Sequence, residues 1–250
     1  MLRIKLTLLT LIISACATVS NSDVILLDSK PINAKSEKIV ENQLNETSID
    51  IWERIRRELT IKIPDDQIAA TSIYRERLYK NQSAVNRISK SGQRYLFHTL
   101  SRAQELDLPV ELALLPFVES EFDPYAKSVD GATGIWQFMP ATGKEWGLKS
   151  NWWYDGKKDV LASTEAALKF LSYLHQKFDE DWLLAMAAYN TGPSRVNRAI
   201  RKNKMQDKGI RFWDLDLPKE TTAYVPKLLV LCELINNPKS FEVNLPSIAN

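Results

Sequence analysis

The sequence predicts an all-α protein, and three observations support this fold class. Apolar residues recur at helical spacing, most clearly in the stretch that follows Asp159, a predicted N-cap. One face of that stretch collects Ala167, Phe170, Leu171, Leu174 and Phe178. Residues that start and stop helices stand at the borders of such stretches. No run of alternating apolar and polar residues between turn signals predicts a substantial sheet.

Residues 1–15 form a predicted lipoprotein signal peptide. They combine a positively charged start, a short apolar stretch and small residues before Cys16, a pattern that resembles the lipobox of bacterial lipoproteins. In such proteins the cysteine becomes the acylated first residue, and more than one acyl chain gives lasting membrane anchorage. Ala17, by resemblance to enteric lipoproteins, predicts the periplasmic face of the outer membrane of a Gram-negative bacterium. A plain secretory signal, with an incidental Cys16, is the alternative.

The next two segments differ in composition. Residues 16–48 are rich in Ser, Asn, Lys and Glu, and we interpret them as a polar tether that holds the following domain off the membrane. Residues 49–108 are predicted to form an N-terminal helical extension, because the stretches 51–57 and 95–100 are amphipathic. We expect this extension to pack on the domain that follows it as one unit.

The remaining helices are predicted within residues 109–240, and residues 241–250 form a C-terminal tail. Residues 182–189 have the apolar composition of a buried helix. Gly192 and Pro193 should end that helix, because glycine commonly follows a last turn and proline cannot continue one.

The last predicted helix contains two prolines and a cysteine. Pro218 can open the helix, since proline is favoured in a first turn, whereas Pro226 should kink or divide it. Cys232 falls on the helical pattern and is expected to be a small buried core residue. The chain has two cysteines, so no intrachain disulfide can form if Cys16 is lipidated.

Charge and histidine content argue against two classes of function. The formal net charge is +2 over 250 residues, which is too small for the basic surface of a nucleic-acid-binding protein. The two histidines, His98 and His175, lie far apart and have no neighbours at ligand spacing. We therefore predict neither a metal site nor a nucleic-acid partner.

The most informative residue is Glu119, which ends the apolar run 112–118. A carboxylate in that place is poorly solvated, so its proton should be held more tightly than usual, as a general acid near neutral pH requires. Alone, such a glutamate more often marks the point where a helix meets water. Gly131 and Gly134 follow, and we interpret them as positions that need positive φ or a close backbone approach. Such a segment suits contact with a bulky polar ligand such as a sugar.

Three ordered motifs follow one another along the chain. They are ESEFDP at 119–124 with Ser128 and GATGIWQFMP at 131–140, then AAYNTG at 187–192, then ETTAYVP at 220–226. Together they resemble the lytic transglycosylases of glycoside hydrolase family 23, the group that includes soluble lytic transglycosylases and goose-type lysozymes. The resemblance covers about residues 49–236 and implies a lysozyme-like helical domain with Glu119 at the lip of a cleft.

Within that family the resemblance is greatest to a membrane-bound group that usually carries LysM wall-binding repeats after the catalytic domain. No such repeat follows the three motifs before Asn250. The expectation is therefore that affinity for the cell wall comes from the cleft or from other proteins.

The resemblance implies a reaction on peptidoglycan glycan strands in which one carboxyl group does the work of two. Glu119 first protonates the glycosidic oxygen between N-acetylmuramic acid and N-acetylglucosamine. It then takes a proton from the C6 hydroxyl of the muramic sugar, which attacks C1 and leaves a 1,6-anhydro end. The N-acetyl carbonyl helps to stabilise the positive centre, and no metal or cofactor is implied. An internal hydroxyl already held near C1 avoids much of the entropy cost of recruiting a nucleophile.

The motifs also imply substrate-binding roles, each with a structural alternative. Ser128 would bind the N-acetyl group or hold Glu119, unless it is a turn-capping serine. Gln137 and Met139 would line the cleft, and Met139 as core filling is the alternative. Tyr189 would orient the N-acetyl group or Glu119, together with Asn190, unless it is a structural tyrosine with a satisfied hydroxyl.

Glu220 and Tyr224 are four residues apart and share one helix face. The resemblance places them near the substrate, whereas an acidic residue in a first helical turn, favoured by the helix dipole, is the alternative for Glu220. Near Glu119, Glu121 should face away on the helix, and Asp123 should shape a turn before Pro124.

Two other functions compete with this prediction. A goose-type muramidase would use water and leave a reducing sugar, although the WQFM segment at 136–139 and the Glu220 motif favour the transglycosylase. A non-catalytic wall-binding scaffold is the alternative from another class, and the intact Glu119-Ser120 pair argues against it.

Overall fold

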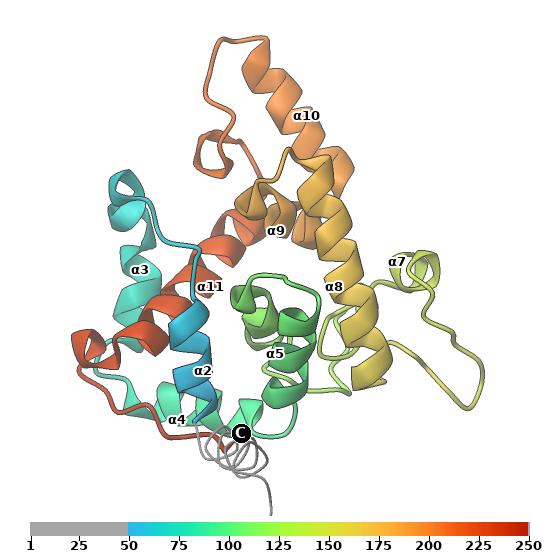
Figure 1. Cartoon of the computed structure of the whole chain (residues 1–250). Coiled ribbons are helices and arrows are strands. Elements are labelled where there is room, and N and C mark those ends of the chain that lie inside the picture. The colour runs from blue at the N-terminus through green and yellow to red at the C-terminus, as the bar shows by residue number, and fades with distance from the viewer. Residues whose placement is uncertain (1–49, 250) are drawn as a thin grey trace, which may run out of the picture. The chain divides into compact units, whose positions relative to one another are not determined.

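The computed structural model describes residues 50–249 and consists of helices joined by loops, of which the longest lie on either side of α7 (Figure 1). The α-helices are α2 (Ile51–Glu58), α3 (Ile68–Leu78), α4 (Gln82–Gly92), α5 (Leu96–Glu105), α6 (Leu115–Glu119), α7 (Pro140–Glu145), α8 (Val160–Lys177), α9 (Trp182–Thr191), α10 (Pro193–Lys204) and α11 (Lys219–Asn236). Short 3-10 helices lie at Asp65–Gln67 (η1), Val110–Leu114 (η2), Phe212–Asp214 (η3) and Pro238–Phe241 (η4). Over residues 50–249 only isolated β-bridges occur and no strand forms, so the predicted all-α class is confirmed.

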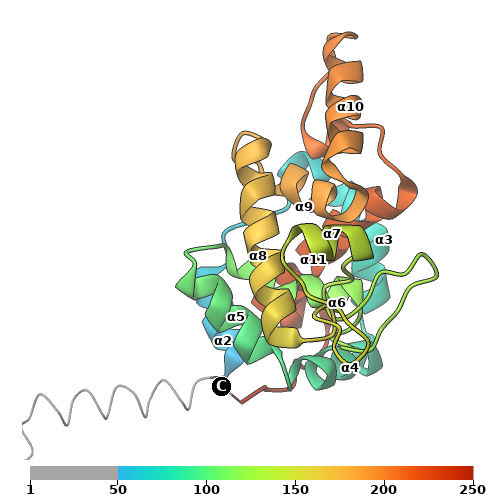
Figure 2. The same cartoon turned by 90° about the vertical axis from the view of Figure 1, so that its right-hand side faces the viewer.

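Helix α8 begins, and helix α9 ends, where the sequence indicates. The side chain of Asp159 accepts a hydrogen bond of 3.0 Å from the amide of Ala162 and caps α8. Asp181 caps α9 in the same way through the amide of Leu184. Gly192 ends α9 with a φ of 88°, a conformation that costs glycine little. Both helices pack against each other, and α10 extends away from them (Figures 1 and 2).

Helix α11 has more buried residues than any other described helix, and it contacts α2, α3, α6 and α9. Pro226, expected to kink or divide this helix, lies inside it and leaves it undivided. Proline lacks the amide that would bond the carbonyl of Thr222. Since Thr222 is exposed, solvent can satisfy that carbonyl, while the proline ring itself is buried in the core. Cys232 is also buried on α11, as predicted.

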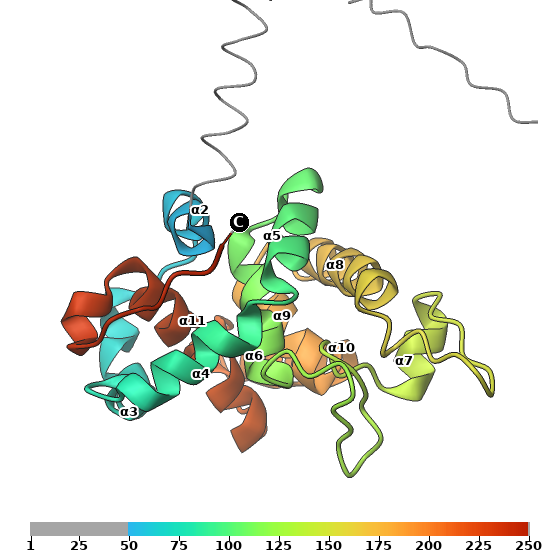
Figure 3. The same cartoon turned by 90° about the horizontal axis from the view of Figure 1, so that it is seen from below.

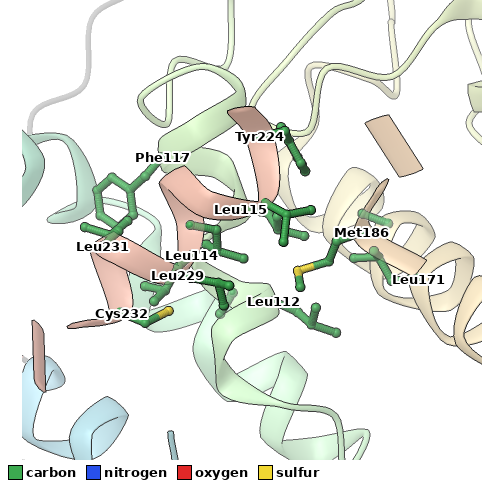
Figure 4. Packing of buried hydrophobic residues seen from close by; sticks show 14 of the residues in the cluster. Leu112, Leu114, Leu115, Phe117, Leu171, Met186, Tyr224, Leu229, Leu231 and Cys232 are labelled. Atoms are coloured by element: carbon green, nitrogen blue, oxygen red, sulfur yellow. The ribbon is translucent and has the colours of Figure 1, made fainter. Parts of the chain in front are cut away.

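The core places α6 at the centre of the fold. Figure 4 shows Leu112, Leu114 and Leu115, from η2 and the start of α6, lying between side chains of α11 and those of α8 and α9. All three leucines are fully buried. Full burial of such a side chain contributes about 1.5–3 kcal/mol, so this packing fixes the short helix α6 and the residue at its end.

The two ends of the described chain meet at α2 (Figure 3). The side chain of Asp50 caps α2 and accepts a hydrogen bond from the amide of Ile248 at 3.0 Å. The indole of Trp52 donates to the carbonyl of Pro246 at 2.8 Å. The segment around Ile248 is thereby tied to the first helix. Within residues 50–249, every helix is too short or too polar to cross a lipid bilayer.

Candidate active site

Helix α6 ends at Glu119, because the backbone leaves helical geometry directly after it. Ser120 has a φ of −150°, and Glu121 and Phe122 adopt positive φ values of 51° and 60°. The prediction that Glu121 continues the helix and faces away from Glu119 is wrong in its first part, because the helix does not continue. Phe122 turns back into the core, where its ring meets Phe117 edge-on at 4.6 Å. Burial of this phenyl ring offsets the cost of the left-handed backbone.

The carboxyl group of Glu119 is bound by one side chain. The hydroxyl of Tyr224 on α11 donates a hydrogen bond of 2.6 Å to Glu119 Oε1. Burial raises the pKa of Glu119 from its ordinary 4.5 to about 8; the Tyr224 hydrogen bond opposes this rise and the charge of Glu220 adds to it. Glu119 therefore holds a proton at neutral pH, as the apolar run before it predicted.

The glycine-containing segment 131–140 is joined to the residue after Glu119 by a hydrogen bond from a side chain to its backbone. Ser120 Oγ donates to the carbonyl of Ile135 at 3.0 Å. Gly131 and Gly134 have φ values of 91° and 82°, which confirms the prediction of positive φ. At Gly134 a Cβ atom would lie 1.8 Å from the carbonyl oxygen of Lys157, so this position also needs glycine for a close backbone approach.

Two residues of this segment connect it to α8 and α9. Trp136 is fully buried, and its indole donates to Thr164 Oγ1 at 2.9 Å. The carbonyl of Trp136 accepts a hydrogen bond of 2.9 Å from the hydroxyl of Tyr189. Burial and the nearby charge of Glu119 raise the pKa of Tyr189 well above its ordinary value. Tyr189 thus has the satisfied hydroxyl of a structural tyrosine, while its ring still faces the site.

Asn190 and Gln137 present amide groups at the site. The Asn190 side-chain oxygen accepts a hydrogen bond of 2.8 Å from Thr221 Oγ1. This bond fixes the orientation of the Asn190 amide group. Within residues 50–249, its nitrogen has no hydrogen-bond partner. Gln137 has a positive φ of 47°, and its side-chain nitrogen donates to the carbonyl of Gly134 at 2.8 Å. The carbonyl oxygen of this amide is left for a ligand.

For Ser128 and Met139 the structure bears on the alternatives that the sequence left open. The hydroxyl of Ser128 accepts a hydrogen bond of 3.0 Å from the amide of Ala132 and so stabilises a turn. Among the described residues it is Tyr224, not Ser128, that bonds Glu119. Met139 is 41% exposed, so the alternative that it fills the core is wrong. Asp123 shapes a turn as predicted, accepting from the amide of Tyr125 at 2.8 Å.

One cavity of about 650 Å³, here called the motif cavity, brings the predicted catalytic and substrate-binding residues together. Its lining includes Glu119, Ser128, Gln137, Met139, Tyr189, Asn190, Glu220 and Tyr224. Sequence reasoning missed Tyr173 of α8, which lines the same cavity, is 44% exposed and packs its ring 5.5 Å from Trp146. An aromatic residue on the polar face of a predicted helix is the signal that could have identified it.

A second cavity of about 880 Å³, here called the extension cavity, meets the first at Val118, Glu119 and Lys227. Its walls come from α3, α4, α6 and α11. Glu119 therefore stands between two spaces, one lined mainly by residues of the sequence motifs and one lined by α3 and α4 together with parts of α6 and α11. No motif in the sequence pointed to the second.

Metal ligands do not gather in the described part of the chain. Residues 50–249 contain no group of three or more His, Cys, Asp or Glu side chains placed to hold an ion. Besides Glu119, the acidic residues that line the cavities are Asp130, Glu145 and Glu220 in the motif cavity and Glu76 and Glu121 in the extension cavity.

Comparisons with known proteins agree with this site. The family described as Transglycosylase SLT domain matches residues 98–212. Membrane-bound lytic murein transglycosylase D of Escherichia coli strain K12 is 41% identical over 198 residues, which are 79% of this chain and 43% of that protein. A protein of Alteromonas sp. strain M-1 named for tributyltin chloride resistance is 46% identical over 164 residues, or 64% of this chain and 79% of its own length.

Among solved structures, the 70 kDa soluble lytic transglycosylase of Escherichia coli aligns with a TM-score of 0.47 and 23% identity, covering 57% of this chain and 24% of that one. The chain spans less than half of the E. coli transglycosylase D that it matches, 43% of its length. The domain match, the identity to these relatives and the raised pKa of Glu119 beside the sequence motifs agree with one another. The chain belongs to the lytic transglycosylase family that carries the SLT domain.

Proposed function

We propose that this protein is a peptidoglycan lytic transglycosylase, which cleaves the β-1,4 bond between N-acetylmuramic acid and N-acetylglucosamine and leaves a 1,6-anhydromuramic end. The observation that carries the proposal is the carboxyl group of Glu119, whose pKa is raised to about 8 by burial and which opens on a cavity of about 650 Å³. Membership of the SLT-domain family supports the same reaction.

Glu119 serves first as the acid. Because its pKa is about 8, it enters the reaction protonated at neutral pH. It gives this proton to the glycosidic oxygen as the bond to C1 breaks, and the N-acetylglucosamine leaves as an alcohol. The positive charge that develops at C1 is stabilised by the N-acetyl carbonyl of the muramic sugar.

Glu119 then serves as the base. It takes the proton of the C6 hydroxyl while that oxygen bonds to C1, so the group returns to its starting state and no water is consumed. Between the two steps it carries a negative charge, and the hydrogen bond of 2.6 Å from Tyr224 stabilises that form. Tyr224 is therefore a positioning residue that limits how far burial raises the pKa of Glu119.

The other residues of the motif cavity hold the sugar. The free amide nitrogen of Asn190 and the free amide oxygen of Gln137 supply one donor and one acceptor for an N-acetyl or hydroxyl group. The exposed thioether of Met139 offers an apolar contact for a sugar face. Ser128 and Glu220 lie in the same cavity and are proposed to contact polar groups of the substrate.

We further propose that the chain acts in the periplasm and is anchored through Cys16 to the periplasmic face of the outer membrane. Cys16, the signal peptide at residues 1–15 and the tether at residues 16–48 lie outside the described residues. The lipobox-like sequence supports the anchor. The name of the E. coli relative describes that protein as membrane-bound, which is consistent with the same arrangement here.

The decisive experiment is mass spectrometry of products released from purified peptidoglycan sacculi by the protein and by Glu119→Gln. Muropeptides that end in 1,6-anhydromuramic acid, absent with the variant, are the expected result. Products one water heavier would replace the proposal with a goose-type muramidase. Sacculi that are bound but not cleaved would replace it with a wall-binding scaffold.

A further inference from the structure

The extension cavity has no role in the reaction as described, although it reaches the reacting carboxyl group. It is lined by Tyr74, Arg77 and Tyr79 from the region of α3, by Arg87 and Ile88 of α4, and by Lys227 and Leu231 of α11, among others. Figure 3 shows α4 leading from α3 toward α6. Because the cavity begins at Glu119, a substituent on a sugar bound in the motif cavity can extend into it.

The charges in this cavity are free to meet a ligand. Arg77, Arg87 and Lys227 form no ion pair with any described carboxylate. The guanidinium of Arg77 lies 5.9 Å from the ring of Tyr74, and Arg87 donates to Ser83 Oγ at 3.2 Å. By contrast, Arg75 on the same helix α3 is paired with Glu233.

The cavity also has acidic and apolar parts. Glu76 and Glu121 line it, so the cations face two carboxylates as well as Glu119. Apolar side chains of Phe117, Val118 and Val230 complete the wall. A ligand that matches this lining carries several carboxylates, an amino group and some apolar surface.

We propose that the extension cavity receives the peptide stem of the substrate, with Arg77, Arg87 and Lys227 binding its carboxylates. This inference rests on the proposed function. The muramic sugar carries its peptide on the lactyl group, close to the bond that Glu119 protonates. Stem peptides contain free carboxylates and a diamino acid, whereas a stripped strand keeps one lactyl carboxylate for each muramic sugar. The mixed lining suits the peptide better than the sugar chain.

The consequence is a substrate preference that depends on α3, α4 and α11. Peptide-bearing strands should be cleaved with a higher kcat/KM than strands stripped of peptide by an amidase. Because the three cations are exposed, the preference should weaken with added salt.

The test compares kcat/KM on peptide-bearing and amidase-stripped glycan strands for the parent protein and for Arg77→Gln/Arg87→Gln. An exposed ion pair changes an equilibrium constant by up to about fivefold, so the ratio of the two kcat/KM values should fall on the order of tenfold. The matched control is Lys90→Gln/Arg94→Gln, which removes two exposed cations, one in the last turn of α4 and one just after it, that do not line the cavity. A ratio that stays within about twofold of the parent, or that falls equally in the control, overturns the proposal.

A second measurement separates this inference from the proposed function. The free tetrapeptide L-Ala-D-Glu-diaminopimelate-D-Ala is titrated into the parent and the double variant, with binding followed by calorimetry. Binding that weakens in the variant but not in the control supports the peptide site even if no anhydro product forms from either strand. Equal binding by all three proteins, or binding by none, overturns it. If anhydro products form while both tests fail, the transglycosylase stands and the peptide site does not.

Discussion

Glu111 and Glu119 stand on either side of the apolar run 112–118, and their carboxyl groups have different surroundings. Glu111, in η2, is fully buried, and its Oε1 accepts hydrogen bonds of 2.5 and 2.6 Å from the backbone amides of Thr60 and Ile61. Glu119, at the end of α6, accepts a single hydrogen bond from Tyr224 and opens on two cavities. Backbone amides are fixed donors that stabilise a carboxylate, whereas one phenol leaves the burial penalty largely uncompensated.

The comparison separates a carboxyl group that stabilises the fold from one that is suited to catalysis. Glu111 joins the segment after α2 to η2 and faces no solvent cavity that also contains Glu119. Its Oε2 is buried without a described partner, and its charge adds to burial in raising the pKa of the Cys232 thiol. Depth of burial therefore does not identify the reacting residue. The reacting residue is identified by a carboxyl group that opens on a cavity and accepts few hydrogen bonds.

The largest expected effect is the loss of activity in Glu119→Gln. The amide keeps the shape of the side chain and can still accept the Tyr224 hydrogen bond, but it cannot give or take the proton. We expect kcat/KM on sacculi to fall by at least about 10³-fold, at the upper part of the range for general acid–base catalysis. Release of anhydromuropeptides measures it. Circular dichroism should show an unchanged helix content, and a variant that retains near-parental turnover would show that another group does the chemistry.

Glu111→Ala should lower stability and leave the activity of the folded protein unchanged, the reverse of what is expected for Glu119→Gln. It leaves two backbone amides without their acceptor and creates a cavity, so the free energy of unfolding should fall by about 3 kcal/mol. Denaturant titration measures this loss. The activity of the protein that remains folded should stay near the parental value. Glu111→Gln keeps an acceptor and should recover part of the stability; if it instead abolished activity in folded protein, the separation of the two glutamates would be wrong.

The pH dependence of stability gives the third test. Between its ordinary pKa of 4.5 and its folded-state pKa of about 8, Glu119 is ionised in the unfolded chain but protonated in the folded one. Stability contributed by this residue is therefore complete below about pH 4.5 and is lost as the pH rises toward 8. The Glu119→Gln variant has no titrating group at this position, so its stability should not fall in this way. The unfolding free energy of the parent should fall relative to the variant by about 2 kcal/mol over that interval, after allowance for solvent in the cavity. Parallel curves would mean that Glu119 titrates normally.

Much of the site could be predicted from the sequence because its residues come in short local motifs. Gly131 and Gly134 predicted positive φ, and Asp159 predicted the start of α8. Every motif residue proposed for the site lines one cavity. These features depend on neighbouring residues, for which sequence patterns are informative.

The features that were missed depend on residues distant in sequence. The partner of Glu119 is 105 residues away, on a helix whose pattern shows only that Tyr224 shares a face with Glu220. The helix ends at Glu119 because Phe122 packs into the core, which a local pattern does not reveal. The extension cavity is assembled from four helices, and α3 itself buries only Thr71, so it lacks a recognisable apolar face.

The smallest expected effect tests the single hydrogen bond that distinguishes Glu119 from an unassisted buried acid. Tyr224→Phe removes the donor that stabilises the carboxylate, so the pKa of Glu119 should rise further above its value of about 8. The charge formed between the two proton transfers is then less stable, and kcat should fall about tenfold, the equivalent of about 1.4 kcal/mol for a hydrogen bond to a charged group. The basic limb of the pH–rate profile should move to higher pH. Tyr189→Phe is the matched control, since its hydroxyl donates to the carbonyl of Trp136 rather than to Glu119. If the basic limb moved in the control and stayed in Tyr224→Phe, the phenol that tunes the acid would be Tyr189, and the geometry of α9 would matter more for the chemistry than that of α11.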